Sequence, residues 1–282
     1  MAHRRTKVVA LVVALVVVVA VGVGADRLWS TVRSQFASDT CTVGEYDLDP
    51  GQAGVAATMV GEVGKFDGGR LPDRAALLVL MAGLQESKLT DLASGDGDRD
   101  SVGVLQQRPS QGWGGSGSIE HRAEVLTDVG EATREFLAAL VQVPHWRTVA
   151  PAKAIQAVQV SADGSAYAQH RSEAGVLAAA FLGRTPAGVS CSFDAPTEVA
   201  APSRVAALAS ADLGIDTPRA AAGAVRVPGA HWQTAAWFVA YADRLGIEQV
   251  DYDGRRWTRT GGWRRAAGVG SGAVVATMYR KT

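Results

Sequence analysis

The sequence predicts a mainly α-helical domain, followed by a small α+β domain and preceded by one N-terminal transmembrane helix. Three observations support this fold class. An uncharged apolar run fills residues 8–24, residues 50–191 carry apolar side chains at helical spacing, and residues 204–282 combine one amphipathic helix with short alternating segments. The expected order is a cytoplasmic tip and anchor (1–25), a tether (26–49), a helical domain (50–191), a linker (192–203) and a C-terminal domain (204–282).

The apolar run VVALVVALVVVVAVGVG follows the basic stretch MAHRRTK. Its seventeen residues are just enough to span a bilayer. Because the basic residues flank its N-terminal side, we expect a single-pass cell-membrane protein whose N-terminus is cytoplasmic and whose domains lie outside. The alternative is a signal peptide cleaved near the small residues Gly24 and Ala25, which releases a secreted protein.

The segment from residue 50 to 191 is predicted to be helical because its apolar residues recur at helical spacing between glycine and proline breaks. Runs with this pattern are GQAGVAATMVGEVGKF, PDRAALLVLMAGLQES, IEHRAEVLTDVGEATREFLAALVQV, PAKAIQAVQV and AYAQHRSEAGVLAAAFLG. Little of the segment alternates with the period of two that a strand requires. The polar, proline-containing stretch SFDAPTEVAAPS, residues 192–203, is the expected linker.

The C-terminal segment has a different pattern. TAAWFVAYADRLG is typical of an amphipathic helix with a glycine stop, IEQVDYDG and RRWTRTGG of short strands around turns, and GAVVATMYRKT of a closing strand. Its charged and aromatic residues predict a surface that recognises a peptide stem or a glycan, unless the tryptophans belong to the core and the arginines are merely solvated. These residues are Asp251, Asp253, Arg255, Arg256, Trp257 and Trp263.

Charge and cysteine content limit the function classes. The chain has 28 basic and 28 acidic residues, so nothing indicates nucleic acid as a partner. The two cysteines, Cys41 and Cys191, suit an exported protein in which they form a disulfide at the two ends of the helical domain. A loop of that size contributes about 4 to 5 kcal/mol on the chain-entropy model. The alternative is a pair of free, buried thiols.

Glu86 stands at the end of the apolar run LPDRAALLVLMAGLQ. Pro72 and Asp73 suit the first turn of a helix, and residues 75–84 are all apolar or glycine, which predicts a buried helix. At the C-terminal end of such a helix, apolar surroundings and the helix dipole both raise the pKa of Glu86. A carboxyl group of this kind is a general acid near neutral pH. The alternative is that the helix emerges into solvent at Glu86.

Two short stretches resemble a known family. Glu86-Ser87 after an apolar helix, followed by GVLQQ at residues 103–107, resemble the ES and GLMQ signatures of the lysozyme-like lytic transglycosylases. The strings DSVGVLQQRPSQGWG and VPHWRTVAPAKAIQAVQVSADGSAY are similar to a group of actinobacterial exported proteins of that family. The resemblance covers residues 65–183. The C-terminal domain, with its helix followed by DGRRW, distantly resembles the zinc D-Ala-D-Ala carboxypeptidases.

The resemblance implies a lysozyme-like fold and a peptidoglycan-cleaving activity of the lytic transglycosylase or muramidase type. Glu86 is then the single catalytic acid and base on the β-1,4 bond between N-acetylmuramic acid and N-acetylglucosamine. Most glycosidases pair two carboxylates, whereas lytic transglycosylases use one, and groups of the sugar itself complete the reaction to an anhydro product. No motif of the sequence fixes a second acid.

Further residues are predicted to bind the glycan. Ser87 is expected to orient Glu86, Gln106 and Gln107 to bind N-acetyl groups, and Trp113 to stack on a sugar ring. Each has a structural alternative, because a glutamine pair also occurs in turns and a tryptophan between glycines also packs a loop. Tyr167 lies where the family has a third motif, although AYAQH departs from the usual AYN.

No cofactor or metal is expected. The acidic run from Asp96 to Asp100 resembles a calcium loop, but Ser101 and Gln107 stand where that loop requires glycine and glutamate. His231 is the only histidine of the C-terminal domain, which is therefore expected to be non-catalytic. The predicted partners are peptidoglycan glycan strands and the membrane. Besides the enzyme, two alternatives are a non-catalytic wall-binding module and a structural partner of a cell-wall or secretion machine.

Overall fold

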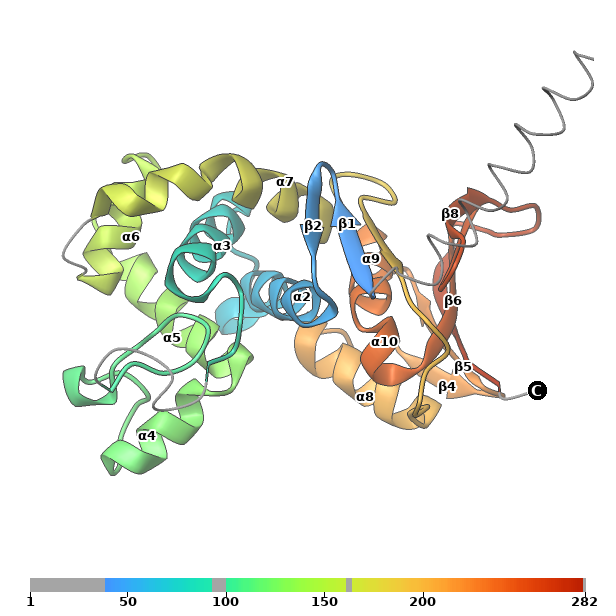
Figure 1. Ribbon diagram of the computed structural model, residues 1–282, viewed down its shortest axis with the longest axis horizontal. Helices are drawn as coiled ribbons and strands as arrows, with labels where there is room; N and C mark the ends of the chain where they lie inside the picture. Colours follow the sequence, from blue (N-terminus) through green and yellow to red (C-terminus); the bar gives the residue numbers. More distant parts are fainter. Residues whose placement is uncertain (1–38, 93–99, 161–163, 281–282) are drawn as a thin grey trace, which may run out of the picture. The chain divides into compact units, whose positions relative to one another are not determined.

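The computed structural model describes residues 39–92, 100–160 and 164–280, and Figure 1 shows how their helices and strands are arranged. The α-helices are α2 (Pro50–Lys65), α3 (Asp73–Ser87), α4 (Ile119–Leu126), α5 (Val129–Gln142), α6 (Pro151–Gln159), α7 (Arg171–Phe181), α8 (Pro202–Leu213), α9 (Trp232–Ala240) and α10 (Ala242–Leu245). Short 3-10 helices are η1 (Phe66–Gly68), η2 (Pro109–Gln111) and η3 (Gly164–His170).

The predicted membrane anchor, residues 8–24, lies outside the described residues. Within the described ranges, no helix is both long enough and apolar enough to cross a membrane.

A three-stranded antiparallel sheet joins the two ends of the segment that was predicted to be helical. Its strands are β1 (Thr40–Val43), β2 (Tyr46–Leu48) and β3 (Val189–Ser192), in the order β2-β1-β3. Gly44 turns β1 into β2 with a φ of 62°, a conformation that glycine adopts at no steric cost. Cys41 lies directly opposite Cys191 in the register, and the predicted disulfide between them is confirmed.

The predicted fold class is wrong. Helices make up about 48 % and strands about 18 % of the structure, and the strands form two antiparallel sheets, so the chain is not a mainly α-helical domain with a separate α+β addition. Residues 40–48, predicted to be a tether, instead supply two strands to the first sheet. The error has a physical cause: strands of three or four residues are too short to show a period of two clearly.

Helix α3 lies in the core, as its apolar run predicts. It packs against α2, α5, α6, α7 and η3, and its side chains from Leu78 to Leu84 are buried. The helix begins at Asp73, directly after Pro72, and ends where Lys88 adopts the left-handed conformation. Lys88 donates its backbone N–H to carbonyl groups of the last turn, which satisfies helix acceptors that otherwise lack partners. This end of α3 presents Glu86 and Ser87.

The second sheet has six strands in the order β4-β5-β9-β6-β7-β8, and all neighbours are antiparallel. The strands are β4 (Arg219–Ala221), β5 (Ala224–Pro228), β6 (Ile247–Tyr252), β7 (Arg255–Thr258), β8 (Gly262–Arg265) and β9 (Ala273–Met278). Helices α8 and α9 pack against one face of this sheet. Their contacts bury the inward side chains of the central strands, for example Val225, Val250 and Val274.

Two tryptophans join the small sheet to the large one. The indole N–H of Trp257 donates to the Cys191 carbonyl at 3.0 Å, and that of Trp263 donates to the Val189 carbonyl at 2.8 Å. Trp257 is fully buried and contacts Phe193 edge to face. The expected aromatic recognition surface is therefore wrong for Trp257. Residues 39–282 form one compact unit, and the stretch 192–203 leads from β3 into α8 within it.

Candidate functional site

The carboxylate of Glu86 lies at the C-terminal end of α3, where three elements meet. The hydroxyl of Tyr167, in η3, donates a hydrogen bond to Glu86 Oε1 at 2.5 Å. The side chain of Gln159, the last residue of α6, also favours the ionised form of Glu86. Glu86 itself is half-buried, whereas Tyr167 is only 1 % exposed. The carboxylate is therefore held in place on its inner side and is not sealed from solvent.

Burial raises the pKa of Glu86 above its ordinary value. The hydrogen bond from Tyr167 and the amide of Gln159 act in the opposite direction, because they stabilise the ionised carboxylate, but burial is the largest influence. Within the described part of the chain, no charged group contributes to this pKa. The carboxyl group is thus biased toward its protonated form by its surroundings rather than by a neighbouring acid.

Helix η3 is fixed to α3 by more than the Tyr167 bond. Gln85 Oε1 accepts a hydrogen bond from the amide of Gln169 at 3.0 Å and lies 3.2 Å from Nε2 of His170. Consecutive residues of α3, Gln85 and Glu86, therefore bind the same 3-10 helix. This double attachment positions the phenol of Tyr167 against the carboxylate.

The hydroxyl of Ser87 connects the end of α3 to the GVLQQ segment at residues 103–107. It donates to the Val104 carbonyl at 2.8 Å and accepts the backbone N–H of Thr90 at 3.1 Å. The amide of Gln159 donates to the Leu105 carbonyl at 2.8 Å. The two sequence signatures, seventeen residues apart, therefore meet in space through Ser87.

The two predicted glutamines do not form a matched pair. Gln106 adopts a left-handed conformation, with φ of 47°, and its amide turns back to the Gly103 carbonyl at 2.9 Å. Gln107 is 1 % exposed and donates to the Ala132 carbonyl of α5 at 3.2 Å. The structure therefore places Gln107 in the core, where it holds the segment to α5, and leaves only Gln106 of the pair near the surface.

The other residues singled out in the sequence are placed as follows. Trp113 is half-buried two residues after η2 and packs against the core. Asp100 accepts the backbone N–H of Ser110 at 2.8 Å and binds Arg108 at 2.7 Å, and Ser110 first and Arg108 second hold the pKa of Asp100 well below its usual range. Gln159 was not predicted, because nothing in PAKAIQAVQV distinguishes a glutamine that reaches a carboxylate from one that faces water.

Gly103 gives a direct test of how tightly the GVLQQ segment is held. Its φ is 72°, and a Cβ at this position lies 2.1 Å from the Leu126 carbonyl oxygen. We expect Gly103→Ala to lower the free energy of unfolding by about 3 kcal/mol, of which about 1 to 2 kcal/mol comes from the left-handed conformation alone.

Gly112→Ala is the matched control for this prediction. Gly112 also has a positive φ, 95°, but no atom lies within 4 Å of a Cβ there. Denaturant unfolding of both variants separates steric clash from backbone strain. Equal losses in the two variants contradict a tightly packed segment at Gly103.

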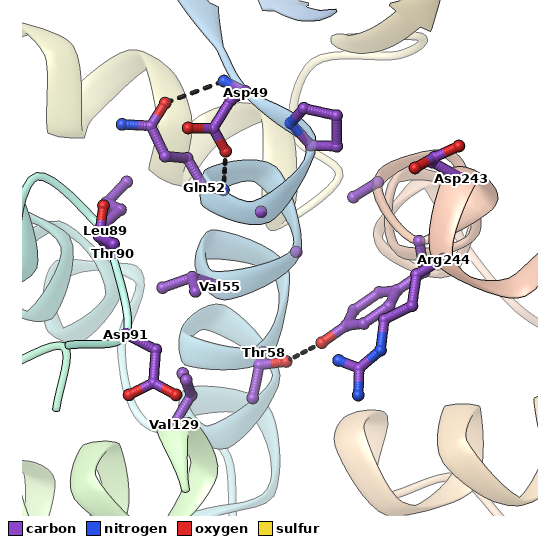
Figure 2. A pocket seen from close by; sticks show the side chains of 15 residues that line it. Asp49, Gln52, Val55, Thr58, Leu89, Thr90, Asp91, Val129, Asp243 and Arg244 are labelled. Carbon is purple, nitrogen blue, oxygen red and sulfur yellow. Dashed lines mark hydrogen bonds between the residues drawn. The ribbon is translucent and has the colours of Figure 1, made fainter. Parts of the chain in front are cut away.

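A cavity of about 370 Å³ lies elsewhere, between α2, the segment after α3 and α10. Figure 2 shows Asp91 and Val129 on one side of it and Arg244 on the other, with Thr58 of α2 between them. The Thr58 hydroxyl pairs with Tyr241 at 2.5 Å. Glu86 is not among the residues that line this cavity. The cavity is therefore a separate feature from the carboxylate site.

Comparison with models of known protein families gave no match, and neither did a sequence comparison with curated proteins.

Proposed function

We propose that the protein cleaves the β-1,4 bond between N-acetylmuramic acid and N-acetylglucosamine in peptidoglycan, with Glu86 as general acid and base. The observation that carries the proposal is the Glu86 carboxyl itself: its pKa is raised by burial, it is half exposed, and Tyr167 and Gln159 hold it. A carboxyl group with these properties keeps a proton closer to neutral pH than an ordinary glutamate does.

The chemistry needs only this carboxyl. Protonated Glu86 gives its proton to the glycosidic oxygen as the bond between that oxygen and C1 of the muramyl residue breaks. The resulting carboxylate is stabilised by the hydrogen bond from Tyr167 and by the amide of Gln159. It then takes a proton from the group that attacks C1. When that group is a hydroxyl of the same sugar, the product is an anhydro sugar, and when it is water, the product is a free reducing end.

The surroundings of Glu86 support a mechanism with one carboxylate. Asp100, the nearest acid in sequence to GVLQQ among the described residues, is engaged by Arg108 and Ser110, and it makes no contribution to the pKa of Glu86. In this proposal Ser87 is a positioning residue, because it fixes the segment with Gln106 against the end of α3. Gln106 and Trp113 remain the candidates for glycan contact.

The cellular setting follows from the same proposal. The N-terminal apolar run anchors the chain in the cell membrane, and residues after it work outside, where glycan strands are the partner. The confirmed disulfide agrees with a compartment in which disulfides persist.

Digestion of purified peptidoglycan by the full-length chain in a neutral detergent tests the activity, with mass spectrometry of the released fragments. Soluble muropeptides that end in an anhydro sugar or a new reducing end support the proposal. Retention of the chain on peptidoglycan without release of fragments supports a wall-binding module instead. If the chain is not retained on peptidoglycan and releases no fragments, the glycan is not its ligand, and a structural partner is favoured instead.

Tyr167→Phe is expected to shift the pH dependence of fragment release. Activity requires protonated Glu86, so it falls as pH rises through the pKa of this residue. The substitution removes a hydrogen bond that favours the carboxylate, so the pKa of Glu86 rises. The alkaline limb of the pH–activity profile therefore moves about one pH unit higher. Tyr46→Phe, in the β1–β2 hairpin, is the control. An alkaline limb that stays in place or moves lower contradicts the assigned role of Tyr167.

A further inference from the structure

The outer face of the six-stranded sheet carries a row of arginines that runs across the strands. Directly opposed residues on neighbouring antiparallel strands point to the same face. The register links Arg219 to Arg226, Arg226 to Val275, Val275 to Asp251, Asp251 to Arg256 and Arg256 to Arg264. One residue from each of the six strands, in the order β4-β5-β9-β6-β7-β8, therefore stands in a single line. At about 4.8 Å between strands, this line is about 24 Å long.

Most of the charge in this row lacks a counter-ion. Asp251 pairs with Arg256 through both oxygens, at 2.7 and 2.8 Å, and also accepts the amide of Gln249 at 3.0 Å. Among the described residues, no hydrogen bond or ion pair engages the side chains of Arg219, Arg226 or Arg264, and all three are exposed. Asp251 is thus committed to one arginine, and three cations remain unpaired.

The strand register places like charges opposite each other, which destabilises the sheet when no anion is bound. Arg219 stands directly opposite Arg226, and neither side chain has a counter-ion among the described residues. Like charges in directly opposed positions destabilise a sheet. The neutral total charge of the chain conceals this local excess, because residues 204–282 hold eleven basic and six acidic residues. An anion bound between opposed arginines relieves the repulsion.

A cavity of about 290 Å³ lies at the middle of the row. Arg226, Asp251 and Val275 line it, together with residues of the glycine-rich loop between β8 and β9. Since Asp251 is neutralised by Arg256, Arg226 is the group of this cavity that is left to bind a ligand, and it selects an anionic one. The absence of side chains at Gly268, Gly270 and Gly272 lets a ligand approach the loop backbone closely.

We propose that the unpaired arginines of this row, Arg219, Arg226 and Arg264, with the cavity at its centre, bind a flexible, linear phosphodiester polymer that runs across the strands. The planar guanidinium matches phosphate geometry through paired hydrogen bonds. A polymer with regularly repeated charges matches a line of arginines better than a single anion does. The proposal does not rest on the reaction assigned to Glu86.

The composition of the face separates such a polymer from a nucleic acid. Proteins that bind single strands of nucleic acid stack the bases on aromatic side chains. In the sheet as described, the strand residues that share the outer face with the arginines include no aromatic side chain, because Tyr252, Trp257 and Trp263 belong to the opposite face. The expected ligand therefore carries phosphates and no bases.

The test measures binding of the full-length chain, in a neutral detergent, to fluorescent poly(glycerol phosphate) over a range of salt concentrations. Arg219→Gln with Arg226→Gln is expected to weaken binding about tenfold and to reduce the slope of log affinity against log salt by about 1.4, the value for two lost phosphate contacts on a flexible strand. Arg171→Gln with Arg204→Gln, two exposed arginines on helices α7 and α8, is the matched control and should bind as the wild type does.

Two further ligands and a folding control complete the experiment. The double variant, Arg219→Gln with Arg226→Gln, should melt no lower than the wild type, because it loses an opposed like-charge pair. The single variant Arg226→Gln should show part of the loss of binding affinity. Single-stranded DNA and a polyuronate of equal charge should both bind more weakly than poly(glycerol phosphate). Tighter binding of either ligand, an equal loss in the control variant, or no binding at low salt overturns the proposal.

Discussion

Glu86→Gln is expected to reduce the release of peptidoglycan fragments by about a hundredfold to ten-thousandfold, the range that general acid catalysis contributes. The amide has the shape of the carboxyl group and still accepts the hydrogen bond from Tyr167, but it has no proton to give to the glycosidic oxygen. Rates of fragment release by wild type and variant on the same peptidoglycan measure the effect. Glu45→Gln, an exposed glutamate in the β1–β2 turn, is the matched control and should keep wild-type activity.

The same variant supplies its own folding control through pH. The pKa of Glu86 is raised in the folded state, so the folded chain binds more protons than the unfolded chain between the ordinary value, about 4.3, and the raised value. Wild-type stability therefore falls as pH rises through that window, because a buried group must ionise. Glutamine avoids this loss. The variant should melt higher than the wild type at pH 7, and the difference should vanish below about pH 4.

Loss of the disulfide is the largest expected change in stability. Cys41 and Cys191 are 150 residues apart in sequence, and their bond closes almost the whole helical segment into a loop. On the chain-entropy model, a loop of this size contributes up to about 5 kcal/mol through the unfolded state. We expect Cys41→Ala with Cys191→Ala to lower the free energy of unfolding by up to that amount, measured by urea denaturation.

A reducing agent provides the matched control for the disulfide. It should lower the melting temperature of the wild type toward that of the double variant and leave the double variant unchanged. The backbone pairing of β1 with β3 remains in both, so the sheet itself is not the variable. A reductant that affects both proteins equally, or neither, contradicts a stabilising role of the bond.

The parts of the molecule that the sequence predicted correctly depend on strong local patterns. The buried α3 follows from ten consecutive apolar or glycine residues, and the disulfide follows from two cysteines at the ends of one segment. Both features are visible without knowledge of what surrounds them. A partly apolar environment for Glu86 could therefore be predicted from its position at the end of α3, and such an environment raises the pKa of its carboxyl.

The parts that were missed depend on contacts between distant segments. Strands β1 and β2 are too short to show a period, although Gly44 between TCTV and YDL is a hairpin signal. Trp257 is buried because β3, over sixty residues earlier in the chain, covers it. Gln107 is in the core because α5 accepts its amide, and no local pattern distinguishes it from Gln106.

Cleavage of a defined glycan is the sharpest test of Glu86 as the general acid. A peptidoglycan tetrasaccharide with one internal bond from N-acetylmuramic acid to N-acetylglucosamine is incubated with the full-length chain or its Glu86→Gln variant in heavy-oxygen water, and the products are identified by mass spectrometry. We expect the wild type to break this bond alone, giving an anhydro end or a labelled reducing end, and the variant to break it at least about a hundredfold more slowly. Cleavage at wild-type rate by the variant, or no cleavage by a correctly folded wild type, contradicts the role of Glu86.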